Sequence, residues 1–277
     1  MLDLKAVKKL RHETGLGILT CQKALEKANG DHEKAIEILR QEGIKIAHKQ
    51  QRRDSEEGAL FIATNKDKTK AVIIGIQSDT DFVAKSEKLQ AYGKQLAQYA
   101  ITAEHKTKKE LLQAKDKETT YQEALLQLSA GFKEKLELTH YIVIQGKFIG
   151  SYQHSNRLGA VVALSERPKK TQDNAIADQL AIHIVGNNPL AIDSHSIDPT
   201  ILAKERKSTQ IQMEKAGKPT HIIEKIIDTK IKKFIEENTI LGQPFILDQN
   251  KNVAQIIKQV SPTLTITNYH RLEMKST

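Results

Sequence analysis

The spacing of apolar residues changes along the chain, and this change constrains the fold more than any other feature. In the first 45 residues, apolar positions recur every three or four residues, as in Leu4, Val7 and Leu10, and glycines interrupt the pattern. This spacing is typical of amphipathic helices. Residues 1–45 are therefore predicted to form a bundle of three short helices, in which Thr20 and Asp31 cap the second and third helices.

A charged segment, residues 46–57, is predicted to be a linker, and the period of the pattern changes after it. The predicted elements are strands at 58–64 (GALFIAT) and 71–77 (AVIIGIQ) and helices at 86–101, 107–115 and 119–138. The two strands flank the polar turn NKDKTK and predict a β-hairpin, and Ser86 is a suitable N-cap for the first helix. We expect residues 58–138 to form one core subdomain.

The same plan of strands followed by a helix returns after Thr139. The predicted elements are strands at 140–146 (HYIVIQG), 148–154 (FIGSYQH) and 158–166 (LGAVVALSE) and a helix at 172–185. The two long helices also share a pattern, AYGKQLA at 91–97 and AIADQLA at 175–181. These features predict a second, related subdomain over residues 139–277.

Residues 199–238 are predicted to be a helical hairpin inserted in the second subdomain. Pro199 opens the first arm, and the sequence Gly217-Lys218-Pro219 separates it from a second arm rich in isoleucine. The first arm is mostly polar, so the pair is expected to project from the body as an antiparallel coiled coil that buries one seam. Together these elements predict an α+β fold.

Composition excludes several classes of protein. The chain has a single cysteine, Cys21, so it has no internal disulfide and no cysteine-based metal site, and we expect this residue to pack as a small hydrophobe. The sequence shows neither a signal peptide nor an apolar run long enough to span a membrane, so we expect a cytoplasmic protein. The net charge of +9 is compatible with nucleic acid or with an acidic protein partner, and basic residues are interleaved with acidic ones.

The sequence lacks the common catalytic motifs. It contains no phosphate-binding loop, no dinucleotide fingerprint, no H-E-x-x-H and no G-x-S-x-G. His183 lies on an apolar helix face and is predicted to pack in the core, and no pair of histidines has metal-ligand spacing. His154, at a predicted strand end, is more accessible. We therefore expect no enzyme activity, no cofactor and no metal site.

Phe82 stands in a polar context, SDTDFVAK, directly after an apolar strand. One interpretation is that Phe82 packs beneath the following helix and pins the connection. The other is that it is an exposed anchor, because burying a phenylalanine in a partner contributes roughly 2–3 kcal/mol and polar residues would keep such a tip soluble. Residue types alone leave both interpretations open.

Five blocks in order resemble bacterial elongation factor Ts, the family of nucleotide-exchange factors for elongation factor Tu. They are the N-terminal stretch VKKLRHETGLGILTCQKALEKANGDHEKAIEILR, TDFVAK, GSYQH, the helical hairpin with its GKP turn, and LGQPF. The resemblance covers nearly the whole chain. It implies a three-helix module like ubiquitin-associated domains, two related core subdomains and a protruding coiled coil.

The resemblance also implies the site residues. Thr80, Asp81, Phe82 and Val83 would insert into the nucleotide domain of elongation factor Tu and disturb its magnesium site. Ile18 and Leu19, in the N-terminal module, and His154 would be further contact residues. Such a factor would bind elongation factor Tu in its GDP-bound and nucleotide-free forms, promote GDP release, and stay bound until GTP displaces it.

The sequence departs from the family pattern in two places. It stops soon after TITNYHRLEM, where some relatives continue into a further helical module that touches the partner, so we expect that contact to be missing. SNRLG follows the histidine block where the family often has smaller residues, which makes the contact of His154 less defined than that of Phe82.

Three other classes of function compete with this interpretation. A nucleic-acid-binding protein fits the basic charge but not the lack of clustered arginines and stacking aromatics. A ubiquitin-like interaction adaptor fits the three-helix module alone, and an enzyme would need a site that the motifs do not supply. We expect no direct nucleic-acid or membrane binding. Self-association through the hairpin and a 2:2 complex with elongation factor Tu remain open.

Overall fold

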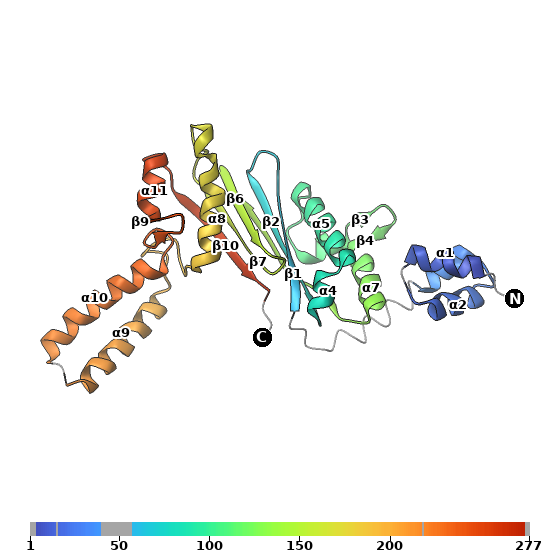
Figure 1. The fold of residues 1–277 in the computed structure, drawn as a ribbon, viewed down its shortest axis with the longest axis horizontal. Helices are drawn as coiled ribbons and strands as arrows, with labels where there is room; N and C mark the ends of the chain where they lie inside the picture. The colour runs from blue at the N-terminus through green and yellow to red at the C-terminus, as the bar shows by residue number, and fades with distance from the viewer. Residues whose placement is uncertain (1–3, 15, 40–56, 218, 275–277) are drawn as a thin grey trace.

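The computed structural model describes residues 4–14, 16–39, 57–217 and 219–274. Helices and antiparallel sheets occupy separate layers, as predicted for an α+β protein (Figure 1). Most of the predicted linker, residues 46–57, and the end of the predicted bundle, residues 40–45, lie outside the described residues. None of the helices in the described ranges is both long and apolar enough to cross a membrane.

The N-terminal module contains α1 (Leu4–Thr14), α2 (Ile18–Lys27) and a helical stretch at 32–39. Its core includes Leu10, Leu25 and Cys21, so Cys21 packs as predicted. Asp31 caps the third stretch by accepting a hydrogen bond from the backbone N–H of Lys34, 3.1 Å away. The prediction for Thr20 is wrong. The N-cap position of α2 is Gly17, which has an extended backbone, and the helix begins at Ile18, so Thr20 lies within the first turn.

The first sheet has the order β1-β2-β5 and is antiparallel throughout. Its strands are β1 (Glu57–Thr64), β2 (Lys70–Ser78) and β5 (Leu136–Gln145), and the helices after β2 include α5 (Glu87–Thr102), α6 (Lys108–Gln113) and α7 (Tyr121–Phe132). A two-residue ladder, β3 (Lys115–Asp116) with β4 (Thr119–Thr120), precedes α7. Ser86 caps α5 as predicted.

Residues 133–138 are not helical, in contrast to the prediction of a helix up to residue 138. Lys133 adopts a left-handed conformation with φ 59° and ends α7, and β5 starts at Leu136. Because β5 pairs with β2, a division between residues 138 and 139 falls inside a strand of the first sheet. A division after Gln145 keeps each sheet within one subdomain.

The second sheet repeats this topology. Its order is β10-β7-β6, formed by β6 (Phe148–His154), β7 (Leu158–Leu164) and β10 (Ile266–Glu273). A 3-10 turn, η1 (Thr171–Asn174), leads into α8 (Ala175–Asn187), and β8 (Pro244–Phe245), β9 (Asp248–Asn252) and α11 (Val253–Val260) complete the subdomain. In each sheet the second strand of the hairpin is central, and the third strand arrives after the helices.

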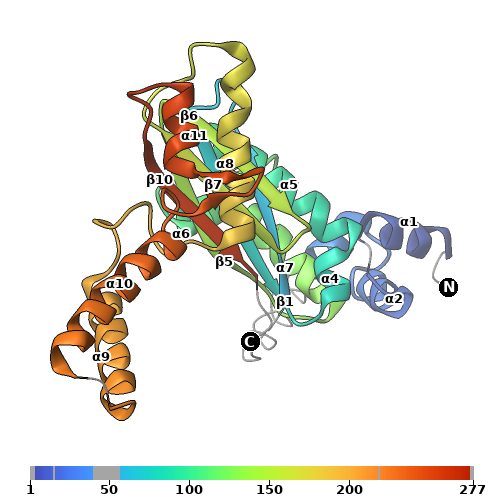
Figure 2. The same ribbon diagram turned by 60° about the vertical axis from the view of Figure 1, so that its left-hand side comes forward.

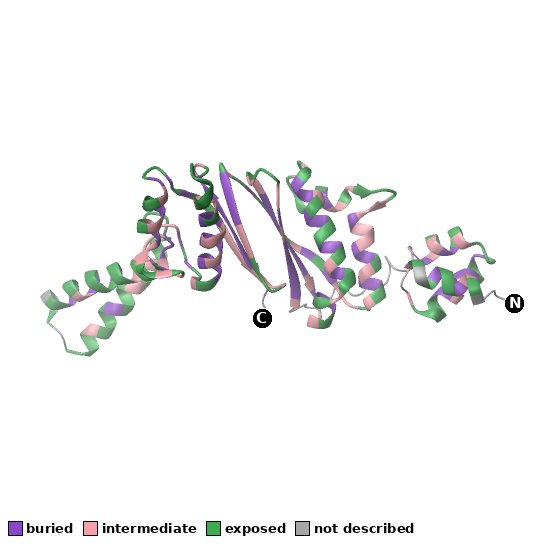
Figure 3. Ribbon diagram, turned by 45° about the horizontal axis from the view of Figure 1, so that its top comes forward, coloured by how far each residue is buried: buried purple, intermediate pink, exposed green. Residues whose placement is uncertain are grey.

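The two sheets pack face to face. Leu60 and Ile73 of the first sheet share a buried cluster with Ile149 and Val161 of the second, whereas Phe61 and the alternate residues of β2 face α5. The resulting layers are helix, sheet, sheet and helix (Figure 3). Because both faces of the central strands are buried, β2 and β7 have nearly continuous apolar sequences.

The hairpin arm consists of α9 (Pro199–Lys215) and α10 (Thr220–Asn238), which extend from the second subdomain (Figure 2). Asp198 caps α9 through the backbone N–H of Thr200, 2.8 Å away. The seam between the arms contains Ile223, Ile227 and Ile231 of α10. The arm thus has a small core of its own.

Candidate functional site

The segment from Thr80 to Val83 begins the five-residue helix α4 (Asp81–Lys85) at the end of β2. Phe82 is 84% exposed, so the interpretation that it packs under the next helix is wrong. Val83, one residue later, is 6% exposed and belongs to the core of the first subdomain. The segment therefore presents Phe82 to solvent and anchors itself through Val83.

Thr80 holds the N-terminal end of α4. Its side chain accepts a hydrogen bond from the backbone N–H of Val83 at 3.4 Å, as an N-cap does. Its own N–H and hydroxyl donate to the two carboxylate oxygens of Glu134, at 3.0 and 2.8 Å. Asp79 accepts the backbone N–H of Lys135 at 3.1 Å. The turn after α7 thus fixes this end of the segment.

The C-terminal end of α4 is fixed from a different direction. The carbonyl oxygen of Ala84 accepts hydrogen bonds from the side-chain amides of Gln90, at 2.8 Å, and Asn156, at 3.4 Å. Asn156 lies in the turn between β6 and β7, two residues after His154. The structure therefore brings the turn beside His154 up to the helix that carries Phe82.

His154 is exposed at the end of β6. Its Nδ1 lies 3.1 Å from the hydroxyl of Tyr152, and the two rings are tilted with centroids 6.1 Å apart. The side chain is accessible, as predicted for a turn histidine, and its neighbouring turn contacts the Phe82 helix.

Asp81 is charged and half exposed at the first position of α4. A hydrogen bond from Lys85, 2.6 Å away, holds the pKa of the Asp81 carboxyl below its ordinary value. A carboxylate in the first turn also interacts favourably with the helix dipole. The tip around Phe82 therefore carries a carboxylate beside an apolar ring.

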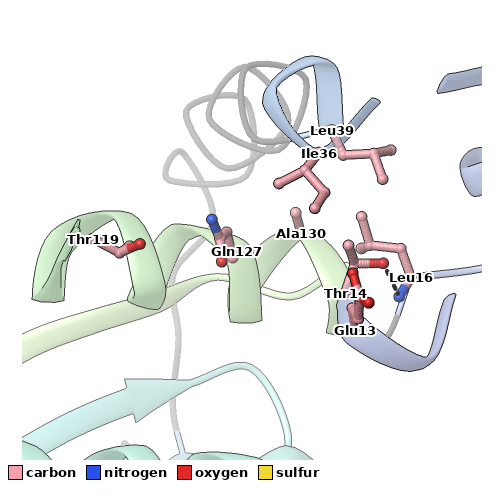
Figure 4. A pocket seen from close by; sticks show the side chains of 8 residues that line it. All are labelled: Glu13, Thr14, Leu16, Ile36, Leu39, Thr119, Gln127 and Ala130. Atoms are coloured by element: carbon pink, nitrogen blue, oxygen red, sulfur yellow. Dashed lines mark hydrogen bonds between the residues drawn. The ribbon is translucent and has the colours of Figure 1, made fainter. Parts of the chain in front are cut away.

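Ile18 and Leu19 form the first turn of α2 and are 49% and 72% exposed. They lie in the N-terminal module, beyond α7 from the sheets (Figure 1). A cavity of about 220 Å³ separates that module from α7, and Figure 4 shows Leu16, Ile36 and Leu39 facing Gln127 and Ala130 across it. Glu13, Thr14 and Thr119 complete its lining. Ile18 and Leu19 are not among these residues, so they remain available on the surface.

Sequence reasoning missed Glu134 and Asn156. They lie 54 and 72 residues from the groups they bind, and neither belongs to a recognisable motif, so no local signal marks them. Among the residues that the structure describes, no group of three or more histidine, cysteine, aspartate or glutamate side chains could hold a metal ion.

The fold is a layered α+β core with a projecting helical hairpin, and its candidate site includes the exposed apolar side chains of Phe82, Ile18 and Leu19. A sequence profile of the family described as Elongation factor TS matches residues 79–276. The chain is 34% identical over 270 residues to an elongation factor Ts of Hydrogenovibrio crunogenus, covering 97% of this chain and 90% of the relative. It is 36% identical over 262 residues to that of a Nitratiruptor species, with 92% and 86% covered, and 32% identical over 269 residues to that of Christiangramia forsetii, with 97% of each covered. The chain belongs to the elongation factor Ts family.

Proposed function

We propose that this protein is the nucleotide-exchange factor of elongation factor Tu in translation elongation. The observation that carries the proposal is Phe82, a phenylalanine 84% exposed on a segment whose backbone is anchored at both ends. An aromatic side chain held in solvent costs solubility and contributes little to the fold, so its value lies in a partner. Membership of the family supplies the partner.

The proposed mechanism needs no acid, base or covalent step. A GTPase holds GDP through loop N–H groups and a magnesium ion that bridges phosphate and protein. Insertion of Phe82 beside that site would displace the ligands of the ion, and the Asp81 carboxylate would help to orient the segment. By linkage, the factor weakens GDP binding by the same ratio by which GDP weakens binding of the factor. GTP that binds after GDP has left can then release the factor.

Thr80 and Val83 have a different role in this proposal from Phe82. Thr80 is half-buried and Val83 is buried, so we assign them to holding the segment and Asp81 and Phe82 to contact. Ile18, Leu19 and His154 are exposed and are proposed as additional contacts. We further propose a ubiquitin-associated-like N-terminal module, two core subdomains divided near residue 145, a coiled-coil arm and a cytoplasmic location.

The test is release of fluorescent GDP from elongation factor Tu, with excess unlabelled GDP and magnesium, on addition of the protein. The Phe82→Ala variant should slow release by about 30-fold, because about 2 kcal/mol of apolar contact is lost. Its thermal unfolding should be unchanged, since the side chain contributes little to the core. Ile211→Ala, which truncates a 43% exposed apolar residue on the hairpin arm, is the matched control. Failure of the wild type to accelerate release would refute the exchange function.

A further inference from the structure

An exposed side chain cannot fix its own position. Phe82 is 84% exposed, so no neighbouring side chain positions its ring, and the backbone of residues 80–83 sets the point and direction from which the ring projects. The helix that carries it, α4, has five residues, and so short a helix is not stable without tertiary support. The precision of the Phe82 position therefore depends on whatever holds this backbone.

Two of the contacts that reach the segment from outside α4 come from Glu134. Both carboxylate oxygens bind Thr80, one through its N–H at 3.0 Å and one through its hydroxyl at 2.8 Å. Hydrogen bonds to an ionised carboxylate are stronger than those between neutral groups, and two of them fix orientation as well as distance. The hydroxyl of Thr80 is at the same time the N-cap acceptor for Val83, so Glu134 also orients the cap.

Glu134 is itself firmly held. The backbone N–H groups of Lys133 and Glu134 donate to the carbonyl oxygen of Ser129, and the buried Ser129 hydroxyl donates to the carbonyl oxygen of Glu134. Lys135 adds a second connection to the same loop, through Asp79. The carboxylate thus transfers the rigidity of α7 to the segment.

We propose that Glu134 is a positioning residue for the exchange reaction, holding residues 80–83 in the conformation from which Phe82 engages the partner. This inference rests on the proposed function. It predicts that loss of Glu134 lowers the rate of GDP release at saturating factor, because a smaller fraction of the segment occupies the productive conformation. It also predicts that the effect operates through Phe82.

The experiment is a double-mutant cycle with Glu134→Ala and Phe82→Ala, supported by hydrogen exchange on the free protein. Glu134→Ala alone should slow GDP release at saturation by at least about tenfold, because it removes both hydrogen bonds to Thr80 and one hydrogen bond to a charged group is worth about that factor. In the Phe82→Ala background it should have no further effect. Glu134→Gln keeps one acceptor oxygen and should fall between the wild type and Glu134→Ala. Glu118→Ala, an exposed glutamate in the turn between β3 and β4, should behave as the wild type.

Hydrogen exchange separates this proposal from the proposed function. The amide of Ala84, which bonds to the carbonyl of Thr80, should exchange faster in Glu134→Ala than in the wild type, with α7 and β2 unchanged. Unchanged protection of Ala84, or an equal slowing of GDP release with and without Phe82, would overturn the positioning role. If the wild type does not accelerate GDP release but Ala84 loses protection in Glu134→Ala, the proposed function is wrong. Glu134 would then position the segment without a role in nucleotide exchange.

Discussion

At the scale of single residues, helix α5 approaches the first sheet very closely at Gly93. A Cβ atom there would lie 2.2 Å from the ring of Phe61 in β1. In the second subdomain the glycine is on the strand instead of the helix. Ala177 of α8 occupies the position that matches Gly93 in the shared helix pattern, and Gly150 of β6 leaves room for the backbone of Ala177. A large strand residue faces a small helix residue in one case, and the strand residue is the small one in the other.

Gly93→Ala is therefore expected to destabilise the protein by about 1–3 kcal/mol, in spite of the better helix propensity of alanine. Gly131→Ala in α7 is the matched control, since its Cβ would be 3.8 Å from the nearest atom, a methyl carbon of Leu16. That variant should be neutral or more stable by up to about 1 kcal/mol. Denaturant unfolding measures both. Equal effects of the two substitutions would contradict the packing argument.

His183 is buried in α8 in the neutral form. Its Nε2 lies 3.0 Å from the amide oxygen of Gln243, and its Nδ1 accepts the backbone N–H of Ile246 at 3.3 Å, so Nε2 carries the proton. Burial lowers the pKa of His183 below its ordinary value of 6.5, and the hydrogen bond with Gln243 offsets part of the effect. A second proton, on Nδ1, would face the N–H of Ile246.

This lowered pKa predicts a loss of stability in mild acid. Above pH 6.5 both the folded and the unfolded protein keep His183 neutral; below it the unfolded chain takes up a proton that the folded chain resists, so the free energy of unfolding falls. His183→Gln should reduce this decline between pH 7.5 and 5.0, at a cost of about 1–2 kcal/mol at pH 7.5. Burial also lowers the pKa values of His140 and His270, so these residues contribute to the same decline in both proteins. The contribution of His183 is therefore the difference between the variant and the wild type in the slope of unfolding free energy against pH. Parallel slopes would refute the assignment.

The sequence could predict Cys21 and His183 as core residues because both lie on apolar helix faces. It could not decide the exposure of Phe82, because a phenylalanine after a polar turn is compatible with packing and with projection. That outcome depends on Thr80, which is held by Glu134, and on Val83, which supplies the buried anchor. Contacts of such long separation leave no periodic pattern.

At the scale of elements, the hairpin arm has one isoleucine buried between its helices and another exposed on its outer surface. Ile227 of α10 is 8% exposed in the seam, whereas Ile211 of α9 is 43% exposed on the outside. Ile227→Ala should destabilise the arm by about 2–4 kcal/mol and speed amide exchange in α9 and α10, while α8 stays protected. Ile211→Ala should leave amide exchange in α8, α9 and α10 unchanged. Faster exchange in α8 as well would mean that the arm and the body unfold together.

The element that sequence reasoning assigned wrongly is the end of α7. Apolar residues continue at helical spacing through Phe132 and Leu136, so the pattern alone favours a longer helix. The left-handed conformation of Lys133 ends it, and pairing of Leu136 with Ser78 of β2 starts the strand. Strand pairing over such a distance is a tertiary effect that overrides local spacing. The β1–β2 hairpin was predictable because its two strands are adjacent and its turn is polar.

At the scale of the whole molecule, the inter-sheet layer determines which parts unfold together. Leu60 and Ile73 from one subdomain and Ile149 and Val161 from the other share one buried cluster, and β1 also contacts β6 and β7 directly. The N-terminal module has a separate core around Leu25. Apart from local opening of the hairpin arm, a protein organised in this way should unfold as two units, the module and the two joined subdomains, because the subdomains share the inter-sheet core.

Ile149→Ala tests this division. Ile149 is fully buried between the sheets, so its truncation should cost about 2–5 kcal/mol, and it should lower the protection of α5 and α8 equally although they lie on opposite outer layers. Leu25→Ala, equally buried, should lower protection in the N-terminal module alone, that is in α1, α2 and the helical stretch 32–39. Hydrogen exchange with mass spectrometry resolves all of these helices in one experiment, which suits a chain without tryptophan. If Ile149→Ala weakened α8 but left α5 protected, the two sheets would be separate folding units. The segment that carries Phe82, which is held by Glu134 from one subdomain and by the turn of Asn156 from the other, would then be fixed by local hydrogen bonds alone.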